Sequence, residues 1–234
     1  MFSLRSRRTA VLVVSAATMF AGIAIGNLRA ETIEEVKARL DTLPEITSMQ
    51  LRATTTGGGE MMQINGTMDL WYQLSDSGVM FRNESAQTVV ITAQNMEMQS
   101  STLMVSTPES TYVQTEQMGQ TMVRRIDRPE MPPSFSAREQ LDQLEESHNL
   151  TVVGTETIEG VECTVIRAEA KQAEGGVMTQ YIANSNGVPR RMVMEGMGMM
   201  GSITTDMVVV SMNEAIDPEK FTYTPPEGVE VMQD

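Results

Sequence analysis

The strongest constraint on the fold is a long alternation of side-chain character between Met62 and Leu74. Every second residue is apolar, aromatic or glycine: Met62, Ile64, Gly66, Met68, Leu70, Tyr72 and Leu74. The residues between them are polar, with Trp71 as the exception. Successive side chains of a β-strand point to opposite faces, so this period predicts a long antiparallel strand with one buried face.

Similar patterns predict that most of the remaining chain is strand. We expect strands at residues 49–53, 87–98, 101–106, 111–116, 121–126, 150–158, 161–170, 177–183, 189–196 and 202–212. Turn residues separate many of them, including the glycines at 57–59 and the segment 184–187. Short turns join antiparallel neighbours, because parallel neighbours need long crossovers. A meander of this size is expected to twist and curl toward an unclosed barrel.

Two short helices are expected beside the sheet. Thr32 and Glu35 have the spacing of a capping box ahead of an apolar stripe that ends before Pro44. Ser136 and Glu139 form a second such box. Helices this short, with so few apolar residues on one face, cannot form a core together, so they are expected to lie on the sheet. The fold class is therefore α+β, mostly antiparallel β.

The first thirty residues have the order of a secretory signal peptide. Three arginines precede an apolar run from Ala10 to Ile25, and Leu28-Arg29-Ala30 provides a small-residue cleavage signal. The apolar run is shorter than the roughly 18 to 20 residues of a membrane span. We expect residues 1–30 to be a cleaved signal peptide, with a retained inner-membrane anchor as the alternative.

The composition of residues 31–234 limits the possible partners. They carry 13 Lys and Arg against 31 Asp and Glu, a net charge of −18. Nucleic acid repels such a chain, so we expect no nucleic-acid partner. Cys163 is the single cysteine, so the exported fold depends on its core without an internal disulfide. The segment has no repeat or linker, and we expect one domain.

Methionine is the unusual residue type, with 22 copies in 234 residues. Many methionines fall at alternating positions of expected strands and so share one face of the sheet. This face is interpreted as ordinary core or as a pliable pocket for long apolar ligands, because flexible thioethers repack around different shapes. A third interpretation is a copper(I) site at Met194, Met197, Met199 and Met200.

We favour the pocket for acyl chains over the other two interpretations. Its expected lining is Met49, Leu51, Met62, Ile64, Met68, Leu70, Tyr72, Met96, Met98, Met192 and Met194.

Catalytic motifs are missing from the sequence. It contains no Gly-x-Ser-x-Gly elbow, His-Glu-x-x-His, Cys-x-x-Cys or phosphate-binding glycine loop. His148 and Cys163 are single copies, interpreted as an exposed histidine and a packed small hydrophobe. We therefore expect neither an enzyme nor a cofactor.

The carboxyl end carries a resemblance to a known family. Phe221-Thr222-Tyr223-Thr224-Pro225-Pro226-Glu227-Gly228-Val229 resembles the closing segment of the periplasmic outer-membrane lipoprotein carrier (LolA-like) superfamily. Asp69-Leu70-Trp71 is similar to the Asp-Leu-Trp that ends the family's second strand. The resemblance implies an unclosed half-barrel, with helices as a lid, that holds the acyl chains of a lipoprotein in the periplasm.

The same resemblance implies binding partners, and this sequence departs from the family at one position. It implies a lipid or acylated lipoprotein ligand, an inner-membrane extractor and an outer-membrane acceptor, and we expect a monomer. The half-barrel also serves in envelope sensing, which is the alternative function. The arginine that pins the family's lid is replaced here by the segment Leu74-Ser75, so that latch is not carried over, although Arg52 or Arg82 could substitute.

Overall fold

The computed structural model describes residues 31–127, 136–172, 176–196, 198 and 201–233. The expected signal peptide lies outside this part of the chain. The helical elements are α1 (Ile33–Leu40), η1 (Thr92–Gln94), α2 (Ala137–Ser147) and η3 (Pro218–Phe221). The strands are β1 (Ser48–Gly58), β2 (Met62–Ser75), β3 (Gly78–Ile91), β4 (Met96–Ser106), β5 (Thr111–Gln117), β6 (Gln120–Ile126), β7 (His148–Ile158), β8 (Val161–Ala170), β9 (Val177–Ala183), β10 (Pro189–Glu195), β11 (Ser202–Met212) and β12 (Val231–Gln233).

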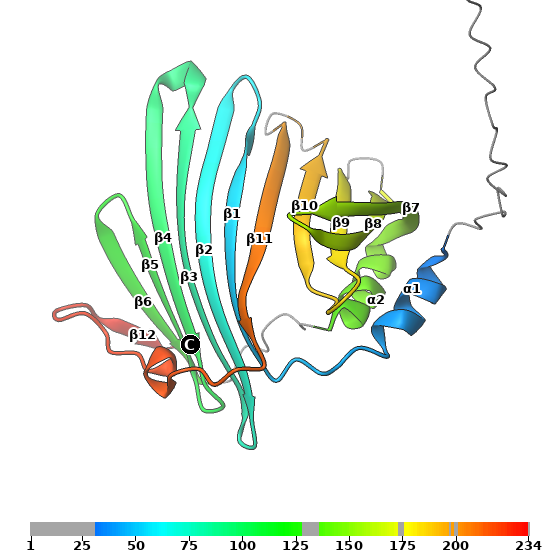
Figure 1. Ribbon diagram of the computed structural model, residues 1–234. Helices are drawn as coiled ribbons and strands as arrows, with labels where there is room; N and C mark the ends of the chain where they lie inside the picture. Colours follow the sequence, from blue (N-terminus) through cyan, green and yellow to red (C-terminus); the bar gives the residue numbers. More distant parts are fainter. Residues whose placement is uncertain (1–30, 128–135, 173–175, 197, 199–200, 234) are drawn as a thin grey trace, which may run out of the picture.

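The twelve strands form one curved sheet that does not close (Figure 1). Their order is β12-β6-β5-β4-β3-β2-β1-β11-β10-β9-β8-β7, so β12 and β7 lie at opposite ends. Every pairing of these strands is antiparallel except that of β12 with β6. The expected antiparallel, unclosed sheet with a few short helices is therefore confirmed.

One expected strand has the wrong bounds. Residues 87–98 do not form a single strand, because residues 92–95 turn the chain from β3 into β4. Asn95 closes this turn with a left-handed φ of 47°. Asparagine adopts that conformation more readily than most residues. The turn contains neither glycine nor proline, so the apolar alternation on both sides conceals it.

The helices begin where the capping boxes predict. The Thr32 hydroxyl accepts a hydrogen bond from the Glu35 backbone N–H at 3.3 Å, and the Glu35 carboxylate accepts one from the Thr32 N–H at 2.8 Å. The Ser136 hydroxyl likewise accepts from the Glu139 N–H. Both helices then pack on the sheet through one buried cluster: Val36, Leu40, Ala137, Leu141, Ile166 and Ile182. Leu150 and Val152 of β7 pack against the same cluster, so the helices cover one face of β7, β8 and β9.

Strand register extends that face across the sheet. Residues directly opposite one another on paired strands share a face. Ile166 lies opposite Gln180, and the same row continues through Met192, Thr205 and Thr55. We call this the inner face, because α1 and α2 lie on it, and the opposite one the outer face.

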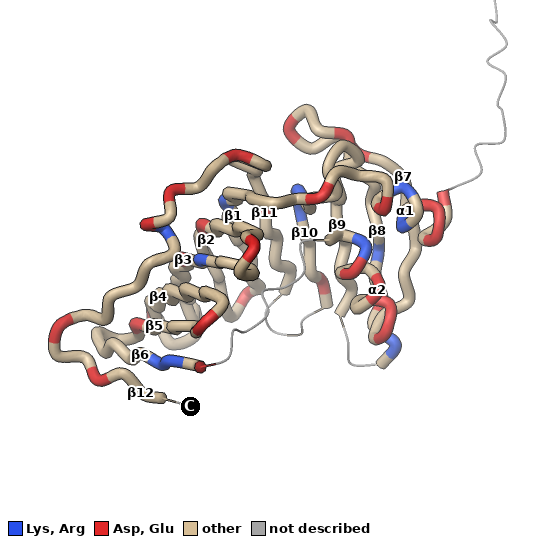
Figure 2. Tube along the Cα trace, turned by 90° about the horizontal axis from the view of Figure 1, so that it is seen from below, with Lys and Arg blue, Asp and Glu red and all other residues tan. Residues whose placement is uncertain are grey.

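The outer face is crossed by the C-terminal segment, residues 213–233 (Figure 2). The Lys220 ammonium lies 4.5 Å from the centre of the Trp71 ring, and the Tyr223 ring stacks on Tyr112 at 4.9 Å. Arg82 donates a hydrogen bond to the Lys220 carbonyl at 3.1 Å. These contacts bury Trp71 on the otherwise polar face of β2 and lead the chain to β12.

A close approach between β1 and β11 requires glycine at position 57. A Cβ added to Gly57 would lie 2.4 Å from the Ser202 carbonyl oxygen and 2.6 Å from the Ile203 Cα. Both atoms belong to the backbone, so neither can move without shifting the strand. We expect Gly57→Ala to lower the free energy of unfolding, measured in urea, by about 3 kcal/mol.

Gly119→Ala is the control for this prediction. Gly119 has a positive φ of 75° but no atom within 4 Å of an added Cβ. Only backbone strain opposes that substitution, at about 1–2 kcal/mol. Equal losses in the two variants would show that the close approach does not constrain position 57.

Candidate functional site

Two apolar bands cross the inner face. The first runs over seven strands in one row of directly opposed residues: Met178, Met194, Ile203, Gly57, Ile64, Val89 and Met98. We call it the methionine row. The second, the lower core, is a buried cluster nearer the other end of the strands: Met49, Leu51, Ala53, Leu70, Phe81 and Val188.

Polar side chains separate the two bands. The row between them includes Thr205, Thr55, Gln87 and Ser100. The Thr55 and Thr205 hydroxyl oxygens are 3.0 Å apart and share a hydrogen bond. Gly66 lies in the same row and adds no side chain to it. The inner face therefore offers hydrogen-bonding groups between two apolar surfaces.

All eleven residues expected to line a pocket lie on the inner face. Four of them are buried, namely Met49, Leu51, Ile64 and Leu70. The other seven are half-buried, namely Met62, Met68, Tyr72, Met96, Met98, Met192 and Met194. The inner face lies on the concave side of the curved sheet, and we call the space on that side the hollow (Figure 2). The buried four can only form its floor, whereas the half-buried seven expose part of their side chains. Their role toward a ligand remains a prediction.

Charged residues are excluded from this face over a wide area. The charged residues of β1 to β5 and β11 are Arg52, Asp69, Arg82, Glu84, Glu97, Glu116 and Asp206. The register places every one of them on the outer face. Several pair there, including Arg52 with Asp69 at 3.0 Å. The acidity of the chain therefore does not reach the inner surface of these six strands.

An ion-pair cluster fixes α1 to α2. The side chain of Lys37 is buried, and its ammonium lies 2.8 Å from Asp142 and 2.6 Å from Glu145. Arg138 pairs with Asp142 and with Asp41. Hydrogen bonds to the two carboxylates raise the pKa of Lys37 above its usual range. The same contact with Lys37, together with Arg138, lowers the pKa of Asp142.

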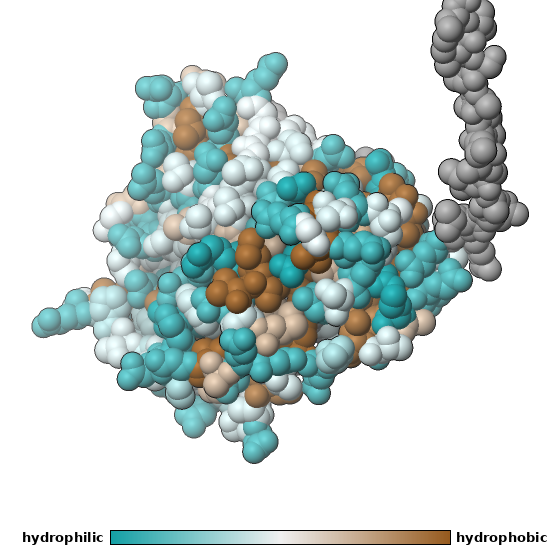
Figure 3. Space-filling model, viewed as in Figure 1, coloured by the Kyte–Doolittle hydropathy of each residue, from teal (hydrophilic) through white to brown (hydrophobic). Residues whose placement is uncertain are grey.

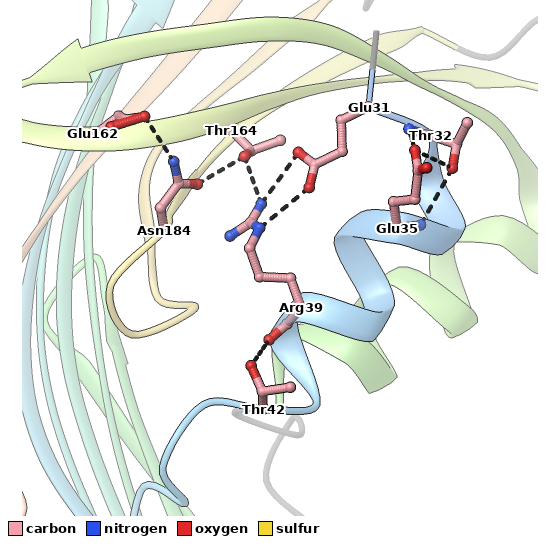
Figure 4. A network of polar contacts seen from close by, with 8 residues as sticks. All are labelled: Glu31, Thr32, Glu35, Arg39, Thr42, Glu162, Thr164 and Asn184. Carbon is pink, nitrogen blue, oxygen red and sulfur yellow. Dashed lines mark hydrogen bonds and ion pairs between the residues drawn. The ribbon is translucent and has the colours of Figure 1, made fainter. Parts of the chain in front are cut away.

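A second polar network fixes α1 to the sheet (Figure 4). Arg39 donates to the Thr164 hydroxyl at 2.7 Å and to Glu31 at 3.3 Å. Thr164 donates to the Asn184 side chain at 2.7 Å, and Asn184 donates to Glu162. Asn184 belongs to the turn expected at residues 184–187, but nothing in the sequence indicated this network.

The two arginines that could have substituted for the latch implied by the resemblance, Arg52 and Arg82, both lie on the outer face. They cannot reach the inner-face helices from there. Lys37 and Arg39 of α1 hold the helices instead.

The outer face has different chemistry. A depression of about 430 Å³ lies there, with Asp69, Arg82 and Glu84 in its lining. Figure 3 shows this face as largely hydrophilic, with hydrophobic residues gathered near the middle of the view over β11. Val208 and Val210 of β11 are exposed there. Neither feature provides the enclosed apolar surface that an acyl chain requires.

The single-copy residues occupy ordinary structural positions. Cys163 is fully buried, and burial raises the pKa of its thiol. His148 is half-buried at the end of α2, with its Nδ1 atom 2.8 Å from the Ser147 hydroxyl. Within the described ranges, no group of three or more His, Cys, Asp or Glu side chains could hold a metal ion.

The alternative copper site cannot be assembled from the described chain. Of its four methionines, Met194 lies in the methionine row, whereas Met197, Met199 and Met200 lie outside the described residues. Met178 faces Met194 across the pairing of β9 with β10.

Known proteins match this chain through structure only. No family model matches the sequence, and no curated protein is similar to it in sequence. An uncharacterized conserved protein from Thermus thermophilus has a TM-score of 0.50 and 12% identity, with 85% of this chain and 99% of that one covered. This likeness establishes the shared fold.

Two further structural neighbours have lower TM-scores. MucB in the Pseudomonas aeruginosa MucA/MucB complex has a TM-score of 0.45 and 10% identity, with 81% of this chain and 61% of that one covered. LolA superfamily protein NE2245 from Nitrosomonas europaea has a TM-score of 0.28 and 9% identity, with coverages of 82% and 98%. The neighbours thus include the superfamily that the sequence resembles.

Among the described residues, no helix is both long and apolar enough to cross a bilayer.

We expect the Lys37 cluster to weaken in acid. The pKa of Asp142 is lowered in the folded chain, so its stabilising contribution is present above the unfolded value of about 3.9 and is lost as the pH falls through the lower folded value. Urea unfolding followed from about pH 6 to about pH 3 measures this loss. Asp142→Asn is expected to show a shallower decline, and an unchanged decline would contradict the prediction.

Proposed function

We propose that this protein is an exported carrier that shelters the acyl chains of a lipid or lipoprotein against its inner face. The carrier would move them across the periplasm toward the outer membrane. The observation that supports this most is the absence of charged side chains from the inner face of β1 to β5 and β11, although residues 31–234 carry a net charge of −18. Such a separation favours an apolar ligand in the hollow and a soluble exterior.

The position of the helices is consistent with an accessible hollow. The buried contacts of α1 and α2 are with β8 and β9. None of the described helices contacts the inner face of β2 to β5 through that cluster. Half-buried side chains such as Met68, Met98 and Met104 are therefore available to a ligand.

The energetics suit a carrier that must release its cargo. Each buried methylene contributes about 0.8 kcal/mol, so roughly a dozen contribute on the order of 10 kcal/mol before costs. Lost translational freedom and ordering of the site remove much of this, which leaves an affinity near micromolar. Methionine-rich lining adapts to chains of different shape because thioether side chains are flexible and unbranched.

Native mass spectrometry tests the proposed function. The mature protein, purified from the envelope of its own host cell, is expected to carry added masses that release fatty acyl groups on extraction. A bare polypeptide mass, combined with no uptake of the hydrocarbon dye diphenylhexatriene, would contradict the proposal.

A charge placed in the methionine row is expected to weaken the binding of diphenylhexatriene. Met98→Glu puts a carboxylate opposite Val89 on the inner face, where binding an apolar ligand would strip it of water. We expect diphenylhexatriene affinity, measured by fluorescence, to fall about tenfold or more, which corresponds to at least about 1.4 kcal/mol.

The neighbouring residue supplies a matched control. Gln99 is exposed on the outer face of the same strand, so Gln99→Glu adds the same side chain one residue away. We expect its dye affinity to match that of the unmodified protein. Equal losses in both variants would show that the inner face is not the binding surface.

A further inference from the structure

The hollow has two walls of different chemistry. On β3, β4 and β5 the inner face carries uncharged polar side chains, which we call the polar wall: Asn83, Ser85, Gln87, Ser100, Thr102 and Thr115. At the levels of Asn83 and Ser85, the inner face of β1, β2 and β11 carries an apolar wall: Leu51, Ala53, Met68, Leu70, Met207 and Val209. The boundary between the walls follows the pairing of β2 with β3.

Asn83 lies on that boundary with an unsatisfied group. It is directly opposite Leu70 on one side and Met104 on the other. Its Oδ1 atom is buried and has no hydrogen-bond partner among the residues that the structure describes. A buried acceptor without a donor destabilises a fold, and an apolar side chain of similar size would avoid this cost. The fold itself therefore gives no reason for asparagine at this position.

The polar wall suits a neutral linkage better than a charged head group. Hydroxyls such as those of Ser100 and Thr102 can donate to a carbonyl oxygen. The Asn83 oxygen can accept from an amide N–H, and a half-turn of the same side-chain amide instead presents its N–H groups to a carbonyl oxygen, as an ester requires. Neither the wall nor the adjoining inner face of β1, β2 and β11 contains a cation to pair with a carboxylate or phosphate. The cation on the Asn83 row is Arg124 of β6, which lies three strands away from Asn83.

We propose that the ligand is an uncharged acyl ester or amide, bound with its chain along the apolar wall and its linkage against the polar wall at Asn83. This assignment rests on the proposed function, because it specifies which part of an acyl ligand the hollow recognises. Met68 and Met104, both half-buried next to this level of the sheet, are flexible enough to move aside and expose the Asn83 oxygen.

A pair of lipids that differ only in the linkage tests the assignment. Dioctanoylglycerol has ester carbonyls, and its dioctyl ether analogue lacks them. Each would compete with diphenylhexatriene for the purified mature protein. We expect the ester to bind about three- to tenfold more tightly, the difference expected for one hydrogen bond between neutral groups.

Substitutions then identify the residues that cause the preference for the ester. In Asn83→Leu we expect equal binding of ester and ether together with a higher melting temperature, because the unsatisfied oxygen is gone. Gln73→Leu is the matched control, since the Gln73 Oε1 atom is also buried and unpaired within the described chain but lies on the outer face of β2. That variant should also melt higher, yet keep the ester preference. Thr102→Val removes one wall hydroxyl with little change of shape and should reduce the preference.

The outcomes separate this assignment from the proposed function. Equal binding of ester and ether by the unmodified protein, or an ester preference that persists in both Asn83→Leu and Thr102→Val, would overturn the assignment alone. If diphenylhexatriene and both lipids fail to bind the unmodified protein, the proposed function is overturned as well.

Discussion

The antiparallel register of β1 with β2 and β11 is the constraint on which the inner face depends. It aligns Leu51 with Leu70 and Val209, so that three apolar side chains meet on one face. The next level, Arg52 with Asp69, then falls on the outer face. A slip of one residue would exchange the two sets and bring a salt bridge into the hollow. The lower core opposes such a slip because it would lose its buried contacts.

Much of this arrangement could be predicted from periodicity alone. The alternation in residues 62–74 assigned every apolar side chain of β2 to the correct face, and the methionines of β4 and β10 followed the same rule. The capping boxes at Thr32 and Ser136 located both helix starts. These features depend on interactions within a few residues, so a local pattern contains the information.

The remaining features depend on contacts between distant parts of the chain. Trp71 breaks the pattern of β2 because the C-terminal segment covers it, and no local sequence indicates such a cover. The contact of Lys37 with Asp142 and Glu145 joins two helices that the sequence could place but not orient. In the sequence, Asn83 is one polar residue among many. It is distinguished from the other polar residues of the wall by its buried oxygen, which has no hydrogen-bond partner among the described residues.

The open seam between β7 and β12 has a mechanical consequence. A closed barrel has its radius fixed by strand number and stagger, so it can admit a wider guest only by breaking pairings. In this protein the two end strands are not joined, and the sheet can change its curvature through small adjustments of twist while every backbone ladder stays intact. The width of the curved sheet between its two end strands is thereby an elastic property of the fold.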